Sequence, residues 1–344
     1  MRAANAIMAA SERRVRPARW RSARSAIMFA LSVLAAAAMI AAPGARAQAP
    51  VQASAQAAAL PPAGAPADGR GGPDGADRPA AAEAAAAGPV LRVCQDPNNL
   101  PFSNRDKQGF ENKIAAVLAA DLGWRIEYTW YPQRMGFIRN TLRAKNPDSD
   151  TYKCDLVTGV AAGFDLGATT RPYYRSSYAM AYVKGKGYDS VRSLDDLLKL
   201  SPAQRASMRL GVFGGSPVTD WLLDHGLIDR MVSYQPQSGD PARYPGEMIE
   251  KDLASGAIDV AFIWGPIAGY FARQSTQAPI VAIPLRQQPG MQFEFDIVMA
   301  TRFGEADYKQ RIDAAIARNQ LKIDAILADY GVPMLPVHER AAAR

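Results

Sequence analysis

The amino-acid sequence predicts a two-lobed α/β protein. From Pro89 onward, short apolar strands alternate with amphipathic helices, and this stretch is long enough for two modest domains. Two long apolar strands, at residues 178–184 and 293–300, bracket a second strand–helix series. Strands that alternate with helices indicate parallel sheets covered on both faces. We therefore predict two parallel or mixed sheets joined by two crossing strands.

The N-terminal residues predict export. Six arginines between residues 13 and 24 precede an uncharged apolar run at about 26–42, and Ala45-Arg46-Ala47 follows with small residues at the positions that signal peptidase reads. An uncleaved membrane anchor is the alternative, but the run is short for about 30 Å of hydrocarbon. We expect a signal peptide at 1–47, a periplasmic location and no membrane insertion after cleavage.

The formal charge of +7 comes from this targeting segment. Cleavage after Ala47 removes eight of the 40 basic residues and one of the 33 acidic residues, which leaves 32 of each. A balanced surface has no electrostatic footprint for nucleic acid or anionic lipid. Residues 48–88, rich in Ala, Gln, Pro and Gly, contain hardly any large apolar side chain and are predicted to be a disordered linker.

The first lobe is predicted to comprise residues 89–184 and 289–344. Its expected elements, in order, are a strand at 91–94, a Pro- and Asn-rich loop at 96–104, a helix that opens at 109–111 and ends at Gly123, a strand at 125–130, a helix at 136–144, a strand at 154–160 and a C-terminal helix at 306–330. The first helix carries apolar side chains at a 3.6-residue period: Phe110, Ile114, Val117, Leu118 and Leu122.

The second lobe is predicted at residues 185–288. Its expected elements are a helix at 193–200, a strand at 210–213, a helix capped by Ser216, a strand near Val232, a helix at 245–255 and a strand at 258–264. Ligands of such folds bind beyond the carboxyl ends of the strands. This places the loops 96–104, 161–174, 214–219 and 264–269 around one cleft.

The predicted mature chain has two cysteines, Cys94 and Cys154. In an oxidising periplasm a lone pair of cysteines favours a disulfide. Because Cys94 ends its predicted strand while Cys154 begins its own, strand geometry could still forbid the bond. No third thiol and no cluster of histidines is available, so the sequence predicts no metal site and no cofactor.

Several polar residues of the cleft loops have both a functional and a structural interpretation. Asn98, Asn99, Ser103 and Asn104 could bind a ligand or partner, but such residues also form ordinary turns. Glu111 could simply stabilise the start of its helix through the helix dipole.

Two further residues of these loops could contact an anion. Arg171 could grip a carboxylate or merely pin a loop, and we favour the loop. Ser216, followed by a proline, could bind an anion at a helix start or only cap the helix.

The run 91–181 resembles the first lobe of type II periplasmic solute-binding proteins, through Pro101-Phe102, Gly109-Phe110-Glu111, Cys-Asp-Leu-Val at 154–157 and Arg171-Pro172-Tyr173-Tyr174. Segments 211–221 and 258–270 match the second lobe. Longer strings are similar to the MxaJ/XoxJ group: CQDPNNLPFSN at 94–104, GFENK at 109–113, YTW at 128–130, Gln133-Arg134, GFIRNTL at 136–142 and TRPYYRS at 170–176. That group consists of solute-binding-like proteins associated with periplasmic PQQ-dependent alcohol dehydrogenases, chiefly methanol dehydrogenases.

The resemblance also reveals a departure. Amino-acid-binding relatives hold the ligand carboxylate with an arginine after the third strand, and the amine with an acid near the strand that returns to the hinge. Here Asp165 and Leu166 stand where the arginine would fall, and 263–266 read Ile-Trp-Gly-Pro without an acid. A zwitterion without charge partners would lose its hydration uncompensated. Ordinary amino-acid capture is therefore not expected.

The sequence gives little support to a catalytic function. The chain has two histidines, His225 and His338, and neither is paired with a convincing nucleophile. The Gly-Gly-Ser-Pro-Val run at 214–218 lacks the second glycine of a nucleophile elbow, and 211–215 misses the dinucleotide fingerprint. We predict that the protein is not an enzyme, although a dehydratase on this fold would need only a positioned carboxylate and an arginine.

The sequence therefore favours an interaction protein that binds a PQQ-dependent alcohol dehydrogenase, with its cytochrome c as a further candidate partner, and assists its maturation or activity. The alternatives are the receptor of an ABC importer for a small solute and, third, a dehydratase. Tyrosines 173 and 174 belong to an aromatic concentration of which some members must be core, and any left exposed would suit a protein contact. The predicted ligand or partner cleft consists of Asn98, Asn99, Pro101, Phe102, Ser103, Asn104, Glu111, Arg134, Arg171, Tyr173, Tyr174, Ser216 and Trp264.

Overall fold

The computed structural model describes residues 88–337 except 236–239, 241 and 277, all within the unit Pro73–Arg344. The predicted signal peptide lies outside the described residues, as does the predicted linker apart from Gly88. Within the described part of the chain, no helix combines the length and apolar character that a membrane crossing requires. The lobe boundaries at 184/185 and 288/289 stay a prediction.

Four strands form the first half of the main sheet, in the order β4 (Arg125–Trp130), β1 (Val90–Gln95), β5 (Leu156–Ala161) and β12 (Glu294–Thr301). β1 pairs with β4 and β5 in parallel, whereas β12 is antiparallel to β5. The short strand β6 (Ala168–Thr169) pairs with the end of β12. A separate hairpin joins β2 (Asn98–Asn99) and β3 (Ser103–Asn104) in the loop that follows β1.

The second half follows in the order β7 (Tyr174–Val183), β10 (Val260–Trp264), β8 (Leu210–Phe213) and β9 (Met231–Tyr234). β10 is antiparallel to β7 and parallel to β8, and β8 and β9 are parallel. β11 (Ile280–Pro284) also pairs with β7. Parallel strands with intervening helices thus recur in both halves, as the alternation of strands and helices predicted.

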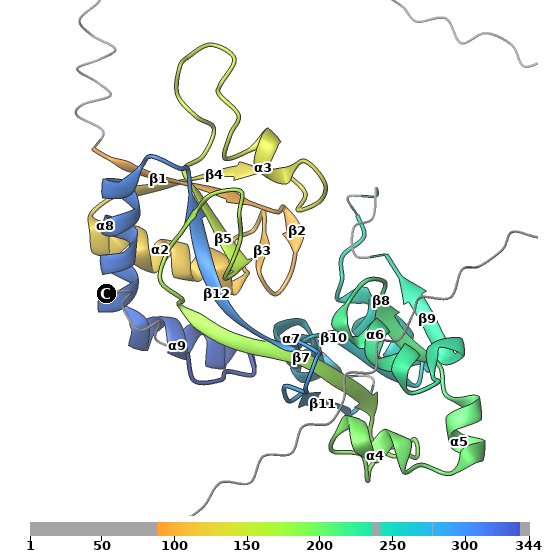
Figure 1. The fold of residues 1–344 in the computed structure, drawn as a ribbon. Helices are drawn as coiled ribbons and strands as arrows, with labels where there is room; N and C mark the ends of the chain where they lie inside the picture. Colours follow the sequence, from red (N-terminus) through yellow and green to blue (C-terminus); the bar gives the residue numbers. More distant parts are fainter. Residues whose placement is uncertain (1–87, 236–239, 241, 277, 338–344) are drawn as a thin grey trace, which may run out of the picture. The chain divides into compact units, whose positions relative to one another are not determined.

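The long strands β7 and β12 join the two halves, and Figure 1 shows them side by side. Ser177 to Tyr174 of β7 pair with Glu294 to Ile297 of β12, and the rest of β7 pairs with β10 and β11. The predicted α/β class with two crossing strands is confirmed. Because the crossing strands pair with each other, the two predicted sheets form one continuous path of strands.

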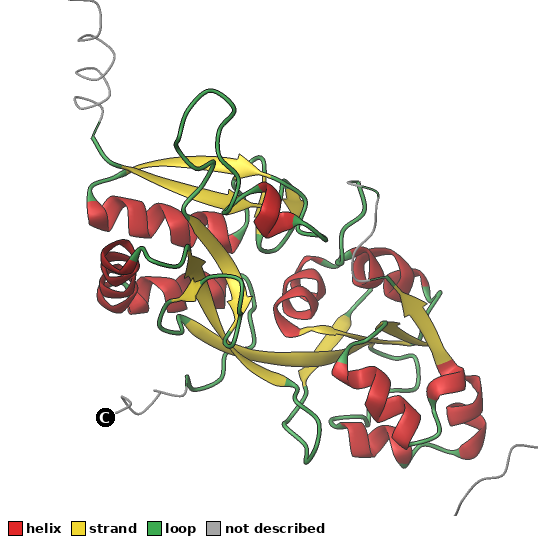
Figure 2. Cartoon of the chain, turned by 45° about the horizontal axis from the view of Figure 1, so that its top comes forward, coloured by secondary structure: helices red, strands yellow, loops and turns green. Residues whose placement is uncertain are grey.

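Helices cover both faces of each half (Figure 2). In the first half, one face packs against α2 (Phe110–Leu122), α8 (Ala306–Arg318) and α9 (Gln320–Asp329), and the other against α3 (Phe137–Asn140). The second half carries α4 (Leu194–Leu198), α5 (Pro202–Ser207), α6 (Pro217–Asp224), the 3-10 turn η1 (Ile228–Arg230), the π-helix η2 (Met248–Leu253) and α7 (Gly265–Gln274). Met180 and Tyr182 face one cluster while Ala179 and Ala181 face the other, as a two-residue strand period requires.

Several helices differ from the sequence prediction. The helix expected at 306–330 is two helices, because the buried Asn319 amide donates to the Ala315 carbonyl oxygen at 2.9 Å and competes with the backbone pattern. The helix expected at 136–144 ends at Asn140, and the one expected at 245–255 is the shorter η2. The prediction missed α5, α7 and β11; α7 begins Gly-Pro and contains a second glycine, residues that weaken any helix signal.

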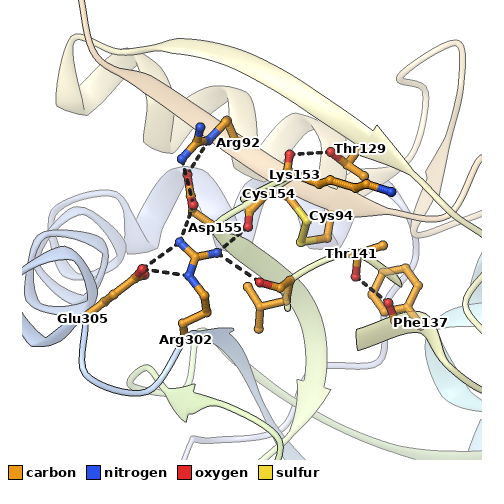
Figure 3. Close-up of a disulfide and its surroundings, with 11 residues drawn as sticks. Arg92, Cys94, Thr129, Phe137, Thr141, Lys153, Cys154, Asp155, Arg302 and Glu305 are labelled. Carbon is orange, nitrogen blue, oxygen red and sulfur yellow. Dashed lines mark hydrogen bonds and ion pairs between the residues drawn. A yellow bond between two sulfur atoms is a disulfide. The ribbon is translucent and has the colours of Figure 1, made fainter. Parts of the chain in front are cut away.

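The predicted disulfide is confirmed. Cys94 and Cys154 are bonded, with their Cα atoms 5.4 Å apart. Beside the bond, Asp155 accepts hydrogen bonds from Arg92 at 2.7 and 3.0 Å and pairs with Arg302 (Figure 3). Arg302 also donates to the Cys154 carbonyl oxygen at 2.5 Å. This network ties β1, the start of β5 and the end of β12 together.

We expect replacement of both cysteines by alanine to lower the free energy of unfolding by about 4 kcal/mol, because the bond closes a 60-residue separation. Urea denaturation of the oxidised protein and of the double variant measures the difference. Reductant should destabilise the wild-type protein and leave the variant unchanged. Equal stability of the two oxidised proteins would contradict the prediction.

Candidate functional site

A cavity of about 370 Å³ lies at the carboxyl ends of β1, β4 and β5. The first half contributes the end of β1, the β2–β3 hairpin, the first turn of α2, the loop after β4 and the middle of β5. The second half contributes residues of the segment between β9 and η2 and the junction of β10 with α7. This is the edge at which ligands bind in open α/β sheets.

Seven of the predicted site residues line this cavity: Asn98, Asn99, Phe102, Ser103, Glu111, Arg134 and Trp264. They come from segments far apart in the sequence, and the fold brings them together. The loops 96–104 and 264–269 reach the cavity, whereas no lining residue comes from 161–174 or 214–219. Across the cavity mouth, the Asn98 side chain donates to the Ala242 carbonyl oxygen at 3.2 Å and so links the two halves.

The other predicted site residues lie outside the cavity lining, and most have a local structural partner. The Pro101 carbonyl oxygen accepts the first N–H of α2, and Asn104 bonds with Gln108. Arg171 is exposed, and its backbone N–H donates to Asp313 on α8 at 2.6 Å. Tyr174 is buried against Phe110.

Ser216 also lies away from the cavity. It precedes α6, but its buried hydroxyl makes no capping hydrogen bond within the described residues. The expected side-chain cap is therefore wrong. Pro217 supplies the first residue of the helix, as the sequence indicated.

Sequence reasoning missed several lining residues, chiefly Gln95, Thr158 and Arg243. Gln95 is the last residue of β1, and Thr158 is a polar residue in the middle of the largely apolar strand β5. The position of Gln95 was a usable signal, because the carboxyl ends of neighbouring parallel strands meet at one edge. Arg243 follows β9 in a segment whose sequence gives no indication that it folds back over the first half.

Glu111 is the buried acid of the cavity. Its side chain is 2% exposed, and its Oε1 atom accepts a hydrogen bond from the Tyr173 hydroxyl at 2.5 Å. The Tyr173 oxygen in turn accepts the Gly159 backbone N–H at 3.0 Å. Burial raises the pKa of Glu111 to about 7, although Tyr173 and the nearby Thr158 favour its charged form. The Oε2 atom makes no hydrogen bond of standard geometry with any described residue.

The backbone of Gly159 lies close to the Glu111 carboxylate. Gly159 has φ +71°, and a Cβ atom added there would lie 3.3 Å from Glu111 Oε1. A glycine at this point therefore allows both the backbone conformation and the close approach of the carboxylate.

Buried amides form a second polar group beside Glu111. The Asn112 side chain donates to Gln95 Oε1, and Gln95 donates to the Thr158 hydroxyl at 3.4 Å. Asn112 Oδ1 accepts the backbone N–H of Gly109 at 3.1 Å, which fixes the start of α2. Asn99 Oδ1 is a second buried acceptor without a partner at the cavity. The cavity thus combines satisfied neutral amides with two unpaired acceptor atoms.

The remaining charges of the cavity lining are already engaged. Asp96 accepts the backbone N–H groups of Asn98 at 2.8 Å and Gln133 at 2.5 Å, so it organises the loops. Arg243 pairs with Glu247 at 2.5 Å. Within the described residues, no group of three or more potential metal ligands is gathered.

The fold and the cavity place the chain among type II periplasmic binding proteins. XoxJ from Methylobacterium extorquens AM1, described as a periplasmic binding protein, superposes with a TM-score of 0.57 at 35% identity, over 72% of this chain and 100% of XoxJ. MxaJ from Methlophaga aminisulfidivorans MPT superposes with a TM-score of 0.59 at 26% identity, over 71% of this chain and 100% of MxaJ. No family model matches the sequence.

The protein named MoxJ of Methylorubrum extorquens strain AM1 is 31% identical over 266 residues, which cover 72% of this chain and 82% of MoxJ. The chain therefore belongs to the MoxJ family. The resemblance to MxaJ and XoxJ that the sequence motifs indicated is confirmed.

Replacement of Glu111 by glutamine should remove a pH-dependent loss of stability. A buried acid whose pKa rises from 4.5 to about 7 keeps its proton only in the folded state, so stability falls as pH rises from about 5 to 7. The 2.5-unit shift corresponds to about 3 kcal/mol. Urea denaturation at pH 5, 6, 7 and 8 should show this loss for the wild-type protein and not for E111Q.

The matched control is E127Q, which removes one acid from the exposed ion pair with Arg125 on β4. An exposed pair contributes little to stability, so the pH profile of E127Q should follow that of the wild-type protein. Identical profiles for E111Q and the wild-type protein would contradict the assignment.

Proposed function

We propose that the protein is a non-catalytic, periplasmic binding-like protein that interacts with a PQQ-dependent alcohol dehydrogenase, chiefly a methanol dehydrogenase, and assists its maturation or activity. Membership of the MoxJ family supports the connection to this enzyme class, through the resemblance of the motifs at 94–104, 109–113 and 170–176. Export to the periplasm, as the N-terminal residues predict, would bring the two proteins into one compartment.

The observation that carries the proposal is a receptor fold in which, among the described residues, the arginine expected to hold a carboxylate does not line the cavity. Arg171, the candidate substitute for that arginine, is exposed beside α8 and does not line the cavity. Arg243, which does line it, pairs with Glu247. A zwitterion would meet an unpaired buried acid there rather than a free guanidinium, which disfavours capture of an amino acid.

A partner surface next to the cavity is available. The loop after β4 forms one wall through Pro132, Gln133 and Arg134, and the neighbouring Met135 side chain is 89% exposed. A large apolar side chain that is exposed to solvent beside a concave site is more typical of a protein contact surface than of a surface that stays free.

Calorimetry with the purified protein and the dehydrogenase of the same organism should show association. We expect Met135→Glu to weaken it at least about tenfold, as truncation of a central contact does. The control is Leu321→Glu on α9, which alters a side chain that is 86% exposed but lies outside the cavity lining. In cells, deletion should lower dehydrogenase activity. Absence of association together with unchanged activity after deletion would refute the proposal.

The alternative is the receptor of an importer for a small solute, which the cavity at the carboxyl ends of the strands favours. The two functions separate in a thermal-shift screen of free solutes, because a ligand that binds only the folded state raises the melting temperature by mass action. A micromolar free solute without dehydrogenase association would favour the receptor.

A further inference from the structure

We propose that the cavity binds an alkylammonium group, which sits against the unpaired Oε2 atom of Glu111. This inference concerns the chemistry of the cavity and holds whether or not the dehydrogenase is the partner. The observations that carry it are the position of a buried carboxylate at the cavity wall and the lack of a countercharge for it within the part of the chain that the structure describes.

Two buried oxygen atoms at the cavity have no hydrogen-bond partner of standard geometry among the described residues. Glu111 uses Oε1 to accept the Tyr173 hydroxyl, and the nearby Thr158 hydroxyl also favours its charged form, whereas Oε2 has no hydrogen bond of standard geometry and no cation beside it within the described residues. Asn99 Oδ1, also at this cavity, is likewise buried and unpaired. When Glu111 is ionised, both atoms are acceptors, so a group that satisfies either of them must donate a hydrogen bond. An ammonium group has three N–H donors and no acceptor.

The charges of the cavity lining also favour a cation. A buried carboxylate is costly unless a cation or several donors compensate it. Glu111 makes no ion pair with any described residue, and the arginine Arg243 is paired with Glu247. Arg134 and Asp240 each have an interaction partner of their own. With Glu111 ionised, the lining holds three carboxylates and two guanidinium groups, a balance that favours a positively charged occupant.

The size of the cavity and its apolar lining suit a short alkyl chain. Phe102, Trp264 and Ile267 supply apolar surface to the same cavity, where an alkyl stem or the cation itself can pack. The volume of about 370 Å³ corresponds to roughly twelve water molecules at about 30 Å³ each. A short alkylammonium ion therefore fits. A free α-amino acid would bring a second carboxylate to the same acid and is disfavoured.

The pH dependence of binding follows from the groups that face Glu111. Tyr173, just before β7, and Tyr174, the first residue of β7, lie on one side of Glu111. Thr158 and Gly159 approach from β5, and the neutral Gln95 and Asn112 lie beside it. The other charged lining residues are Asp96, Asp240, Arg134 and Arg243, and no described histidine lines the cavity. Since alkylammonium ions stay protonated below pH 10, ionisation of Glu111 controls affinity between pH 5 and 8.

Calorimetric titration with n-butylammonium chloride tests the inference, with n-butanol as the uncharged probe. Butylammonium should bind, and its affinity should fall up to about 100-fold from pH 8 to pH 5 as Glu111 takes up a proton. Butanol should bind at least tenfold more weakly at pH 8. E111Q should lose butylammonium binding and E127Q should retain it.

Two further measurements complete the test. Carbon NMR of the Glu111 carboxyl in the wild-type protein should show that saturating butylammonium lowers its pKa by at least one unit, which keeps the inference testable if E111Q does not fold. A lysine blocked as its Nα-acetyl methylamide tests whether the bound ammonium group belongs to a protein side chain or to a free amine, and the norleucine equivalent is its uncharged control. Tighter binding of the lysine derivative than of butylammonium points to a protein side chain. Equal or weaker binding points to a free amine.

The inference is overturned if butylammonium does not bind, if butanol binds equally well, if affinity does not change with pH, or if the pKa of Glu111 is unmoved. These four measurements do not involve the dehydrogenase, so its failure to associate with the protein would not change their results. The outcome is thus independent of the test of the proposed function.

Discussion

The pairing of β7 with β12 is the constraint on which the rest of the structure depends. Without these hydrogen bonds the two halves of the sheet would be separate bodies joined by two single strands. Arg175 reinforces the pairing, because its side chain, 13% exposed, bridges to Glu294 at 2.8 Å and to Asp296 at 3.4 Å on the opposite strand. A largely buried guanidinium held by two carboxylates resists exchange with water and fixes the register of the strands.

That register also positions the cavity acid. Tyr173, immediately before β7, extends its hydroxyl to Glu111 on α2 and accepts a hydrogen bond from Gly159 on β5. The crossing strand, the first helix and a central strand of the first half therefore meet at one buried carboxylate. Such a group costs stability when charged, and costs of this kind concentrate at functional sites. The neighbouring amides of Gln95 and Asn112 are satisfied, so the unpaired Oε2 atom of Glu111 is not a consequence of generally poor packing.

Sequence patterns predicted the elements that carry strong periodicity. The strands β4 and β8 have the predicted bounds, and α2 ends at Gly123, whose φ of +67° suits glycine. The buried stripe of α2 includes Ala115 and Ala119, which are too small to be prominent in a hydrophobic pattern, while the predicted Val117 is only half-buried. The cavity was predicted in part: Glu111 and Asn99 were among the expected residues, but their lack of partners depends on tertiary contacts. Arg243 could not have been found, because nothing local to its segment specifies the fold of the chain over β2.

A third connection between the halves bears on how the cavity works. Gly269 on α7 packs against the Gly331 carbonyl, and a Cβ atom there would overlap it. Tyr270 stacks on Tyr330 with ring centroids 5.6 Å apart, and Arg273 donates to the Ala328 carbonyl oxygen at 2.8 Å.

Rotation of one half about the crossing strands, as in a receptor that closes on a ligand, would have to break these contacts. The arrangement favours a cavity whose acceptor atoms stay at fixed positions. A cavity that stays open can bind a chemical group that is part of a larger molecule, such as a side chain of a protein. A receptor that closes must instead surround its entire ligand. The same packing that limits hinge motion is therefore compatible with the macromolecular partner that we propose.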